Sequence, residues 1–266
     1  MALACLARID AQRPATIAGD VEALHQTRVA ISQFRAIVAF FAPMTSDTTW
    51  PKLKKRLGPL YALLGDARDA DVMTALTHNK RYRKWARGVD AHGLTEHDRS
   101  HRRVADFLRS ARFRNLMNAL RLWVAHGPWA MRRDQSALRL RAATLGTYRQ
   151  QKLKRWRAGL IRRGRDLAAM GGKARHRLRI KVKRYRYALE ALSKICPAGD
   201  RAGLRHLQAS AKHLQHALGN LGDLQRLRRR IGTGLARPPG YRSEKKRLLK
   251  EAHAALHHID QPFSAH

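Results

Sequence analysis

The chain has 266 residues, and its 55 Lys and Arg outnumber its 19 Asp and Glu, which gives a formal net charge of +36. Hydrophobic residues make up 44% of the sequence, so the chain can bury a core and is not a disordered basic tail. This excess of positive charge predicts an anionic partner, because uncompensated self-repulsion would weaken the compact state. Nucleic acid, anionic lipid and polyanionic phosphate all meet that requirement.

Apolar residues recur at helical spacing along nearly the whole chain, and strand-like alternation is hard to find, so we predict an all-α fold. Clusters of Gly and Pro divide the pattern. The predicted helices lie near residues 18–42, 48–65, 67–86, 97–126, 130–168, 173–195, 200–220, 222–235 and 241–259. The Gly127-Pro128 pair is the expected junction between a first helical half, about residues 15–127, and a second, about residues 128–260.

Cys5 and Cys196 match no metal-ligand spacing and give no support for a disulfide framework, which suits a reducing compartment. We therefore predict no metal site and no cofactor. The N-terminal segment is mildly apolar, but Arg8 and Asp10 interrupt it, so it is too short and too broken for a secretion signal or a membrane span. We expect a cytoplasmic protein without a membrane partner.

One sequence motif occurs twice in the chain. Residues 25–35 read HQTRVAISQFR and residues 176–186 read HRLRIKVKRYR, and in both a His is followed three residues later by Arg and ten residues later by Arg. The matched positions are His25, Arg28 and Arg35, then His176, Arg179 and Arg186. A long internal period of this kind indicates two halves that aim the same positive charge at one site.

Each copy places its basic residues on one stripe of a helix, beside an apolar face. The first stripe holds His25, Arg28, Ser32 and Arg35, and the second holds His176, Arg179, Lys183 and Arg186. The neighbouring apolar faces are Leu24, Ala30, Ile31, Phe34, Ile37, Val38 and Phe41, and Leu178, Val182, Tyr185, Leu189 and Leu192. Arg side chains one or two turns apart suit a row of phosphates, because each guanidinium makes forked, charge-assisted hydrogen bonds to phosphate oxygens.

A second repeated segment follows each of these stripes in the sequence. The segment LLGDARDADV, residues 63–72, resembles ALGNLGDLQRL, residues 217–227, so that Gly65 matches Gly219 and Asp69 matches Asp223. We expect each Gly to end one helix and each Asp to cap or brace the next.

These residues resemble the CHAD family, the conserved-histidine α-helical domain. The resemblance rests on HQTRVAISQFRA, LLGDARDADV and HRLRIKVKRYRYALE, and extends from about residue 15 to about residue 258. It implies a single domain over residues 1–266, built from two antiparallel four-helix bundles that are related by a pseudo-two-fold axis around a basic central pore or groove. It also implies that this groove binds inorganic polyphosphate. The site residues carried over by position are His25, Arg28, Arg35, His176, Arg179, Lys183, Arg184 and Arg186.

The first motif departs from the family pattern. Ser32 and Gln33 stand where the family usually carries two basic residues, as Lys183 and Arg184 do in the second motif. The alternating-glutamate strand motif of the triphosphate-tunnel domain that often accompanies CHAD domains is absent from this sequence. The chain therefore resembles the binding domain alone.

The resemblance favours a non-enzymatic polyphosphate-binding protein, associated with polyphosphate granules and with enzymes that metabolise polyphosphate. The alternative is a nucleic-acid-binding protein that uses the same basic surface, because phosphate contacts alone drive non-specific affinity. We find no recognition-helix unit, aromatic RNA-binding motif or zinc module in the sequence to support it. A phosphate-cleaving enzyme ranks third, since the sequence contains no P-loop and few acidic residues.

Overall fold

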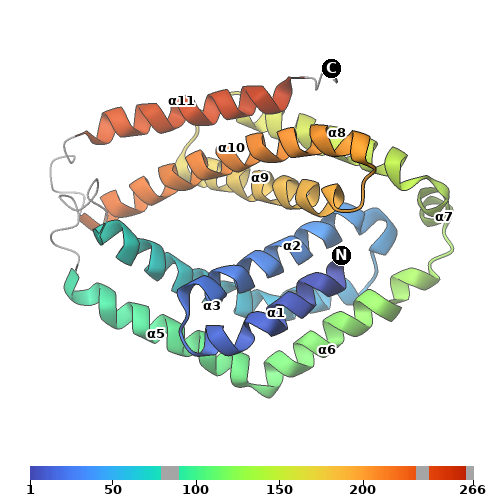
Figure 1. Cartoon of the computed structure of the whole chain (residues 1–266), viewed down its shortest axis with the longest axis horizontal. Helices are drawn as coiled ribbons and strands as arrows, with labels where there is room; N and C mark the ends of the chain where they lie inside the picture. Colours follow the sequence, from blue (N-terminus) through green and yellow to red (C-terminus); the bar gives the residue numbers. More distant parts are fainter. Residues whose placement is uncertain (79–89, 232–239, 262–266) are drawn as a thin grey trace. The chain divides into compact units, whose positions relative to one another are not determined.

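The computed structural model describes residues 1–78, 90–231 and 240–261, and every regular element in these ranges is helical (Figure 1). The predicted all-α fold is therefore confirmed. The chain separates into two compact units, Met1–Ala142 and Ala143–His266. This division lies beyond the expected junction at Gly127-Pro128, because the short helices η1 (Pro128–Met131) and α7 (Gln135–Ala142) pack against α2 (Val21–Thr45) of the first unit.

The first unit is built on α2 and its neighbours α1 (Ala2–Ile17) and α3 (Thr49–His78), with α5 (Asp90–Arg109) and α6 (Ala111–His126) packed alongside. The predicted apolar face of α2 is confirmed at Leu24, Ala30, Ile31, Phe34, Ile37 and Val38, which are buried, whereas Phe41 is half-buried. Helix α1 was not predicted. It buries Leu6 and Ile9 and packs along α2. The first unit therefore contains a helix that the positions of Gly and Pro did not predict.

One predicted helix end in the first unit is wrong. We expected the helix predicted at 48–65 to end at Gly65, but α3 continues through Gly65, as it does through Gly58-Pro59. Pro59 removes a single backbone donor, while Leu57, Leu60 and Leu64 continue one fully buried stripe, and this burial outweighs the local penalty. The continuation of the helix predicted at 67–86 beyond residue 78 lies outside the described residues.

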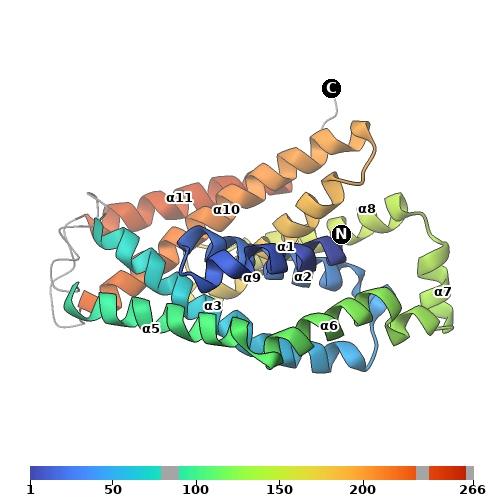
Figure 2. The same ribbon diagram turned by 60° about the horizontal axis from the view of Figure 1, so that its bottom comes forward.

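The helix predicted at 97–126 is two helices, α5 and α6, which follow one another with a bend at Ser110 (Figure 2). The Oγ of Ser110 accepts a hydrogen bond from the Phe113 N–H at 3.2 Å, which is the N-cap arrangement that starts α6. A serine in the middle of a basic, apolar-periodic stretch therefore acts as a helix start.

The second unit contains α8 (Leu145–Gly164), α9 (Gly172–Ser193), α10 (Ala198–Ile231) and α11 (Tyr241–Asp260). Helix α10 packs along both α9 and α11, and α8 contacts the same two helices. The predicted apolar face of α9 is confirmed, since Leu178, Val182, Tyr185, Leu189 and Leu192 are buried. No helix within the described ranges has the length and the apolar character that a bilayer span requires.

The second unit also corrects two predicted boundaries. The helix predicted at 130–168 is divided between α7 and α8, because Thr144 caps α8 by accepting a hydrogen bond from the Thr147 N–H at 3.2 Å. The helices predicted at 200–220 and 222–235 are one helix, α10, that runs through Gly219 and Gly222. The part of this prediction beyond residue 231 lies outside the described residues.

Candidate functional site

The first copy of the repeated motif lies on α2, against α3. We call this the α2–α3 surface, and it consists of His25, Arg28, Arg35, Tyr61 and Gly65. Its three motif side chains are half-buried. Arg28 donates from Nη1 to the Leu64 carbonyl oxygen at 3.2 Å, and its guanidinium carbon lies 5.6 Å from the centroid of the Tyr61 ring. Arg35 lies 4.7 Å from the same centroid, so one tyrosine supports both arginines.

The second copy lies on α9, against α10. We call this the α9–α10 surface, and it consists of His176, Arg179, Lys183, Arg186, Gln215 and Gly219. Arg186 donates from Nε to Gln215 Oε1 at 3.0 Å, and its guanidinium carbon lies 4.1 Å from the centroid of the Tyr187 ring. Lys183 Nζ lies 5.7 Å from that centroid. Glu190 Oε2 lies 3.4 Å from Arg186 Nη1 and is an acidic neighbour of this stripe.

The two surfaces share one detail that the sequence did not predict. Gly65 and Gly219 do not end helices but provide room for an arginine of the motif. A Cβ at position 65 would lie 3.4 Å from Nη1 of Arg28, and a Cβ at position 219 would lie 3.4 Å from Nε of Arg179. Gln215 stands four residues before Gly219, as Tyr61 stands four residues before Gly65, and each contacts the second arginine of its motif.

The predicted roles of Asp69 and Asp223 as caps are wrong, because both lie inside continuous helices. Asp69 is exposed on α3. Asp223 accepts a hydrogen bond from Arg226, one turn further along α10. The repeated Gly and Asp therefore mark a helix interior in both units.

Ser32 and Gln33, which replace the basic pair of the first motif, are buried within the first unit. Ser32 donates to the Arg28 carbonyl oxygen at 2.8 Å, and its Oγ lies 3.4 Å from the Tyr61 hydroxyl. Gln33 accepts a hydrogen bond from Arg8 of α1. These two side chains therefore contribute to packing between helices rather than to an exposed charge.

Lys183 and Arg184 do not lie on the same side of α9. Lys183 belongs to the stripe with Arg179 and Arg186, whereas Arg184 is exposed about 100° further around the helix. Partial loss of water contact lowers the pKa of Lys181, and the charges of Arg163 and Arg184 lower it further. Arg184 therefore adds its charge on the side of Lys181, away from the stripe of Arg179, Lys183 and Arg186.

Cations on α10 that were not predicted from the sequence lie beside the second stripe. Partial loss of water contact lowers the pKa of His216, and the charges of Lys212, Arg186, His213 and Arg179 lower it further. The signal was present in the sequence, since Lys212 and His216 are one helical turn apart. At the matching positions of α3 the first unit carries Gly58 and Ala62, so the two surfaces differ in charge on both of their helices.

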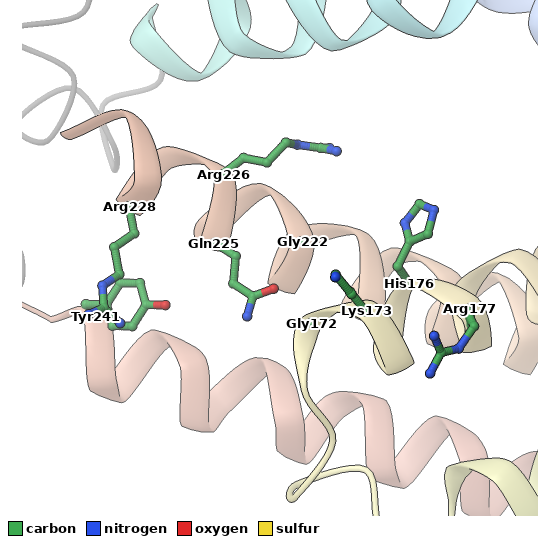
Figure 3. A pocket seen from close by; sticks show the side chains of 9 residues that line it. All are labelled: Gly172, Lys173, His176, Arg177, Gly222, Gln225, Arg226, Arg228 and Tyr241. Atoms are coloured by element: carbon green, nitrogen blue, oxygen red, sulfur yellow. The ribbon is translucent and has the colours of Figure 1, made fainter. Parts of the chain in front are cut away.

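A hollow of about 680 Å³ opens at the start of α9, next to His176 (Figure 3). Its lining includes Lys173, Arg177, Arg226 and Arg228. The N-cap residue of α9 is Gly171, so no side chain caps the first backbone N–H groups of the helix. The positive end of the helix dipole therefore adds to the charges of these side chains. The basic character of the second stripe therefore continues beyond its leading histidine.

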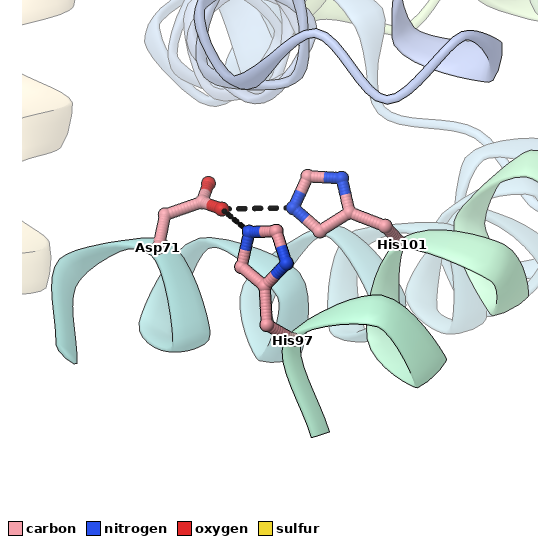
Figure 4. A group of neighbouring side chains, drawn as sticks. All are labelled: Asp71, His97 and His101. Carbon is pink, nitrogen blue, oxygen red and sulfur yellow. Dashed lines mark hydrogen bonds and ion pairs between the residues drawn. The ribbon is translucent and has the colours of Figure 1, made fainter. Parts of the chain in front are cut away.

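The structure also brings together three side chains of metal-ligand type outside these surfaces, Asp71, His97 and His101 (Figure 4). The sequence predicted no metal site and no role for these three residues. The only local signal was a pair of histidines one helical turn apart, and the carboxylate comes from a different helix. A contact between helices of this kind cannot be inferred from spacing in one segment.

Comparison with known proteins agrees with the resemblance seen in the sequence. The family model described as the CHAD domain matches residues 1–232. The fold is similar to the crystal structure of the CHAD domain from the plant Ricinus communis, with a TM-score of 0.68 and 25% sequence identity, over 95% of this chain and 88% of that chain. No curated protein matches the chain.

Proposed function

The chain belongs to the CHAD domain family, and we propose that it binds inorganic polyphosphate, without altering it, through the α2–α3 surface and the α9–α10 surface. One observation carries the proposal. In each unit the first arginine of the motif, Arg28 or Arg179, lies against a glycine of the next helix. In each unit the second arginine of the motif lies two turns further along and contacts the same neighbouring helix. Arg35 contacts the ring of Tyr61, and Arg186 donates to the side-chain amide of Gln215.

The contacts of these arginines suit them to an anionic ligand. Arg28 is held by a carbonyl oxygen and a tyrosine ring, and Arg35 by the same ring. These partners are neutral, so they orient the guanidinium groups without cancelling their charge. Arginines pre-positioned in this way lose less side-chain entropy when they bind phosphate oxygens.

A polyphosphate chain fits this arrangement better than a single phosphate. A chain engages several cations at once, and each contact after the first gains from a high effective concentration. The resemblance further predicts that both surfaces line one groove, and this stays a prediction. In the proposed role the protein works in the cytoplasm, holds polyphosphate in granules and presents it to the enzymes that metabolise it.

A calorimetric titration tests the proposal. Long-chain polyphosphate should bind far more tightly than pyrophosphate or orthophosphate, and its affinity should fall steeply as salt rises because binding releases condensed counterions. Duplex DNA and RNA, compared at equal phosphate concentration and fixed salt, should compete poorly. The polyphosphate should be recovered at its original length by gel electrophoresis. Equal competition by DNA or RNA would instead favour the nucleic-acid alternative.

A further inference from the structure

Helices α3 and α5 place a carboxylate and two imidazoles in direct contact (Figure 4). Asp71 Oδ1 lies 2.8 Å from His101 Nε2 and 3.2 Å from His97 Nε2. The two histidines are one turn apart on α5, and their rings stack with centroids 4.4 Å apart. All three ligand atoms lie within 4.8 Å of one another. Side chains from two helices therefore converge on one small volume.

The surroundings of the cluster favour a bound cation. The side chain of Asp71 is 2% exposed and that of His101 is 9% exposed, whereas that of His97 is 24% exposed and gives solvent a route in. Within the described residues, Oδ2 of Asp71 is buried and accepts no hydrogen bond, and Nη1 of Arg68 lies 3.7 Å from it. A buried carboxylate with an unsatisfied oxygen is costly unless positive charge compensates it.

A second carboxylate lies on the far side of His97. Its Nδ1 lies 3.1 Å from Asp98 Oδ1. A carboxylate at this position holds the proton on Nδ1 and leaves the lone pair on Nε2, which is the tautomer that binds a metal. Nε2 of His97 lies 3.2 Å from Asp71 Oδ1. With a cation between these two atoms, His97 would keep its proton on Nδ1 toward Asp98 and give the Nε2 lone pair to the ion, whereas without a cation Nε2 can donate its own proton to Asp71.

We propose that Asp71 Oδ1, His97 Nε2 and His101 Nε2 bind a divalent transition-metal ion of the zinc type. Two imidazoles and one carboxylate suit zinc and the late first-row metals, whereas magnesium and calcium prefer oxygen ligands throughout. Zinc bonds to such atoms are about 2.0–2.2 Å long, which places neighbouring ligands roughly 3.0–3.5 Å apart. The contacts of 2.8 and 3.2 Å would open by a few tenths of an ångström, and the two imidazole nitrogens, which lie within 4.8 Å of each other, would move to the same spacing.

Three protein ligands leave one coordination position for water or another small ligand. Arg68 lies beside the carboxylate and the half-exposed ring of His97 faces solvent, so the ion would be reachable from outside. The competing interpretation is a histidine–aspartate ion pair that only fastens α5 to α3. The two interpretations differ in whether zinc displaces the protons between these groups.

Untagged, chelator-treated protein is titrated with zinc and, separately, with cobalt(II), in the absence of polyphosphate. We expect saturable binding of one ion per chain, a rise in Tm with zinc, and visible cobalt absorption bands. The variants His97→Asn and His101→Asn should each lose about tenfold or more in zinc affinity. The control His257→Asn with His258→Asn removes an adjacent pair of exposed rings on α11 and should bind zinc as the wild type does.

X-ray absorption of the zinc-loaded wild type provides a readout that does not depend on any variant folding. It should report two imidazoles with oxygen ligands. Sulfur ligands, three or more imidazoles, or no saturable binding would overturn the proposal. So would an equal loss of affinity in the α11 control. Because polyphosphate is absent from every step, the result is independent of the proposed function.

Discussion

Gly65 lies beneath the guanidinium of Arg28, so that a Cβ at position 65 would stand 3.4 Å from Nη1. Gly219 stands in the same relation to Arg179, at 3.4 Å from Nε and 3.6 Å from Nη2. Both glycines are inside long helices, where Gly is less favourable than Ala by about 1 kcal/mol. In each unit a residue that is unfavourable inside a helix therefore stands at the position where an arginine of the motif contacts that helix.

Gly219→Leu should weaken polyphosphate binding about as much as Arg179→Ala does. The leucine side chain would fill the space that Arg179 now occupies and would displace its guanidinium from the α9–α10 surface. Gly219→Ala is the matched control. Its Cβ makes an ordinary van der Waals contact, so affinity should stay within about twofold of the wild type while Tm is kept or raised.

Calorimetric affinity and thermal melting of both variants check this prediction. If Gly219→Ala loses as much affinity as Gly219→Leu, the glycine is needed for the backbone of α10 and not for the space that Arg179 occupies. If both variants bind normally, Arg179 does not use this pose when ligand is bound.

Charge reversal at the repeated arginines should separate binding from folding. Arg179→Glu should lower polyphosphate affinity by about tenfold or more, which corresponds to about 1.4 kcal/mol. The double variant with Arg28→Glu should bind more weakly than either single variant, because both surfaces contribute. Circular dichroism should show unchanged helical content for Arg179→Glu.

Arg114→Glu is the control for net charge, since Arg114 is an exposed residue of α6 outside both surfaces. It changes the total charge by the same amount and should reduce affinity only slightly. A loss as large as that of Arg179→Glu would show that general charge, rather than the repeated arginines, determines binding.

The sequence predicted the fold class and the apolar faces of α2 and α9 because those features depend on periodicity within one helix. It failed at helix ends that tertiary packing decides. Pro59 and Gly65 are local break signals, yet the buried stripe of α3 passes through both. Ser110, in contrast, starts a helix in a stretch that carries no Gly or Pro.

For the candidate site, too, the sequence predicted the features that lie within one helix and not the contacts between helices. The spacing of His25, Arg28 and Arg35 predicted which residues share a face of α2, and the structure places Arg28 and Arg35 against α3. Spacing could not show that Ser32 and Gln33 turn inward or that His216 of another helix lies beside Arg186. These are contacts between helices, and one sequence without its fold does not contain them.

Lys183→Ser and Arg184→Gln should have unequal effects, although the two residues are adjacent. Lys183 lies on the α9–α10 surface, whereas Arg184 lies on the side of Lys181. A direct contact between a charged donor and phosphate contributes about 1.5–3 kcal/mol, so Lys183→Ser should weaken polyphosphate binding by about tenfold. Arg184→Gln should weaken it less, and calorimetry at two salt concentrations should show the difference. Equal losses would place Arg184 in contact with the ligand after all.

Basic residues introduced into the first motif should destabilise the protein. Gln33 is buried and accepts a hydrogen bond from Arg8, so Gln33→Arg would bury a second guanidinium beside the first. A buried, unpaired charge is strongly unfavourable, and we expect Tm without ligand to fall by several degrees. Gln33→Glu serves as the comparison, because it can pair with Arg8 and should melt at a higher temperature than Gln33→Arg. If Gln33→Arg keeps its Tm and tightens polyphosphate binding, position 33 reaches the ligand.

His216 should report ligand binding through its protonation. In the free protein, partial loss of water contact and the surrounding cations Lys212 and Arg186 lower its pKa, so the ring is neutral at neutral pH. Polyphosphate bound to the α9–α10 surface would offset these charges and raise that pKa. Binding should then take up protons, and affinity should increase as pH falls through the range where histidine titrates.

The stability of the free protein should decrease as pH falls, whereas the affinity for polyphosphate should increase. His216 holds its proton less readily in the folded state than in the unfolded state, so its contribution to stability decreases as pH falls. NMR titration of the His216 ring with and without polyphosphate measures the shift directly, with orthophosphate at equal phosphate concentration as the control. His216→Gln should remove part of the pH dependence of binding. A titration midpoint that does not rise with polyphosphate would show that the ligand does not reach the α9–α10 surface near this residue.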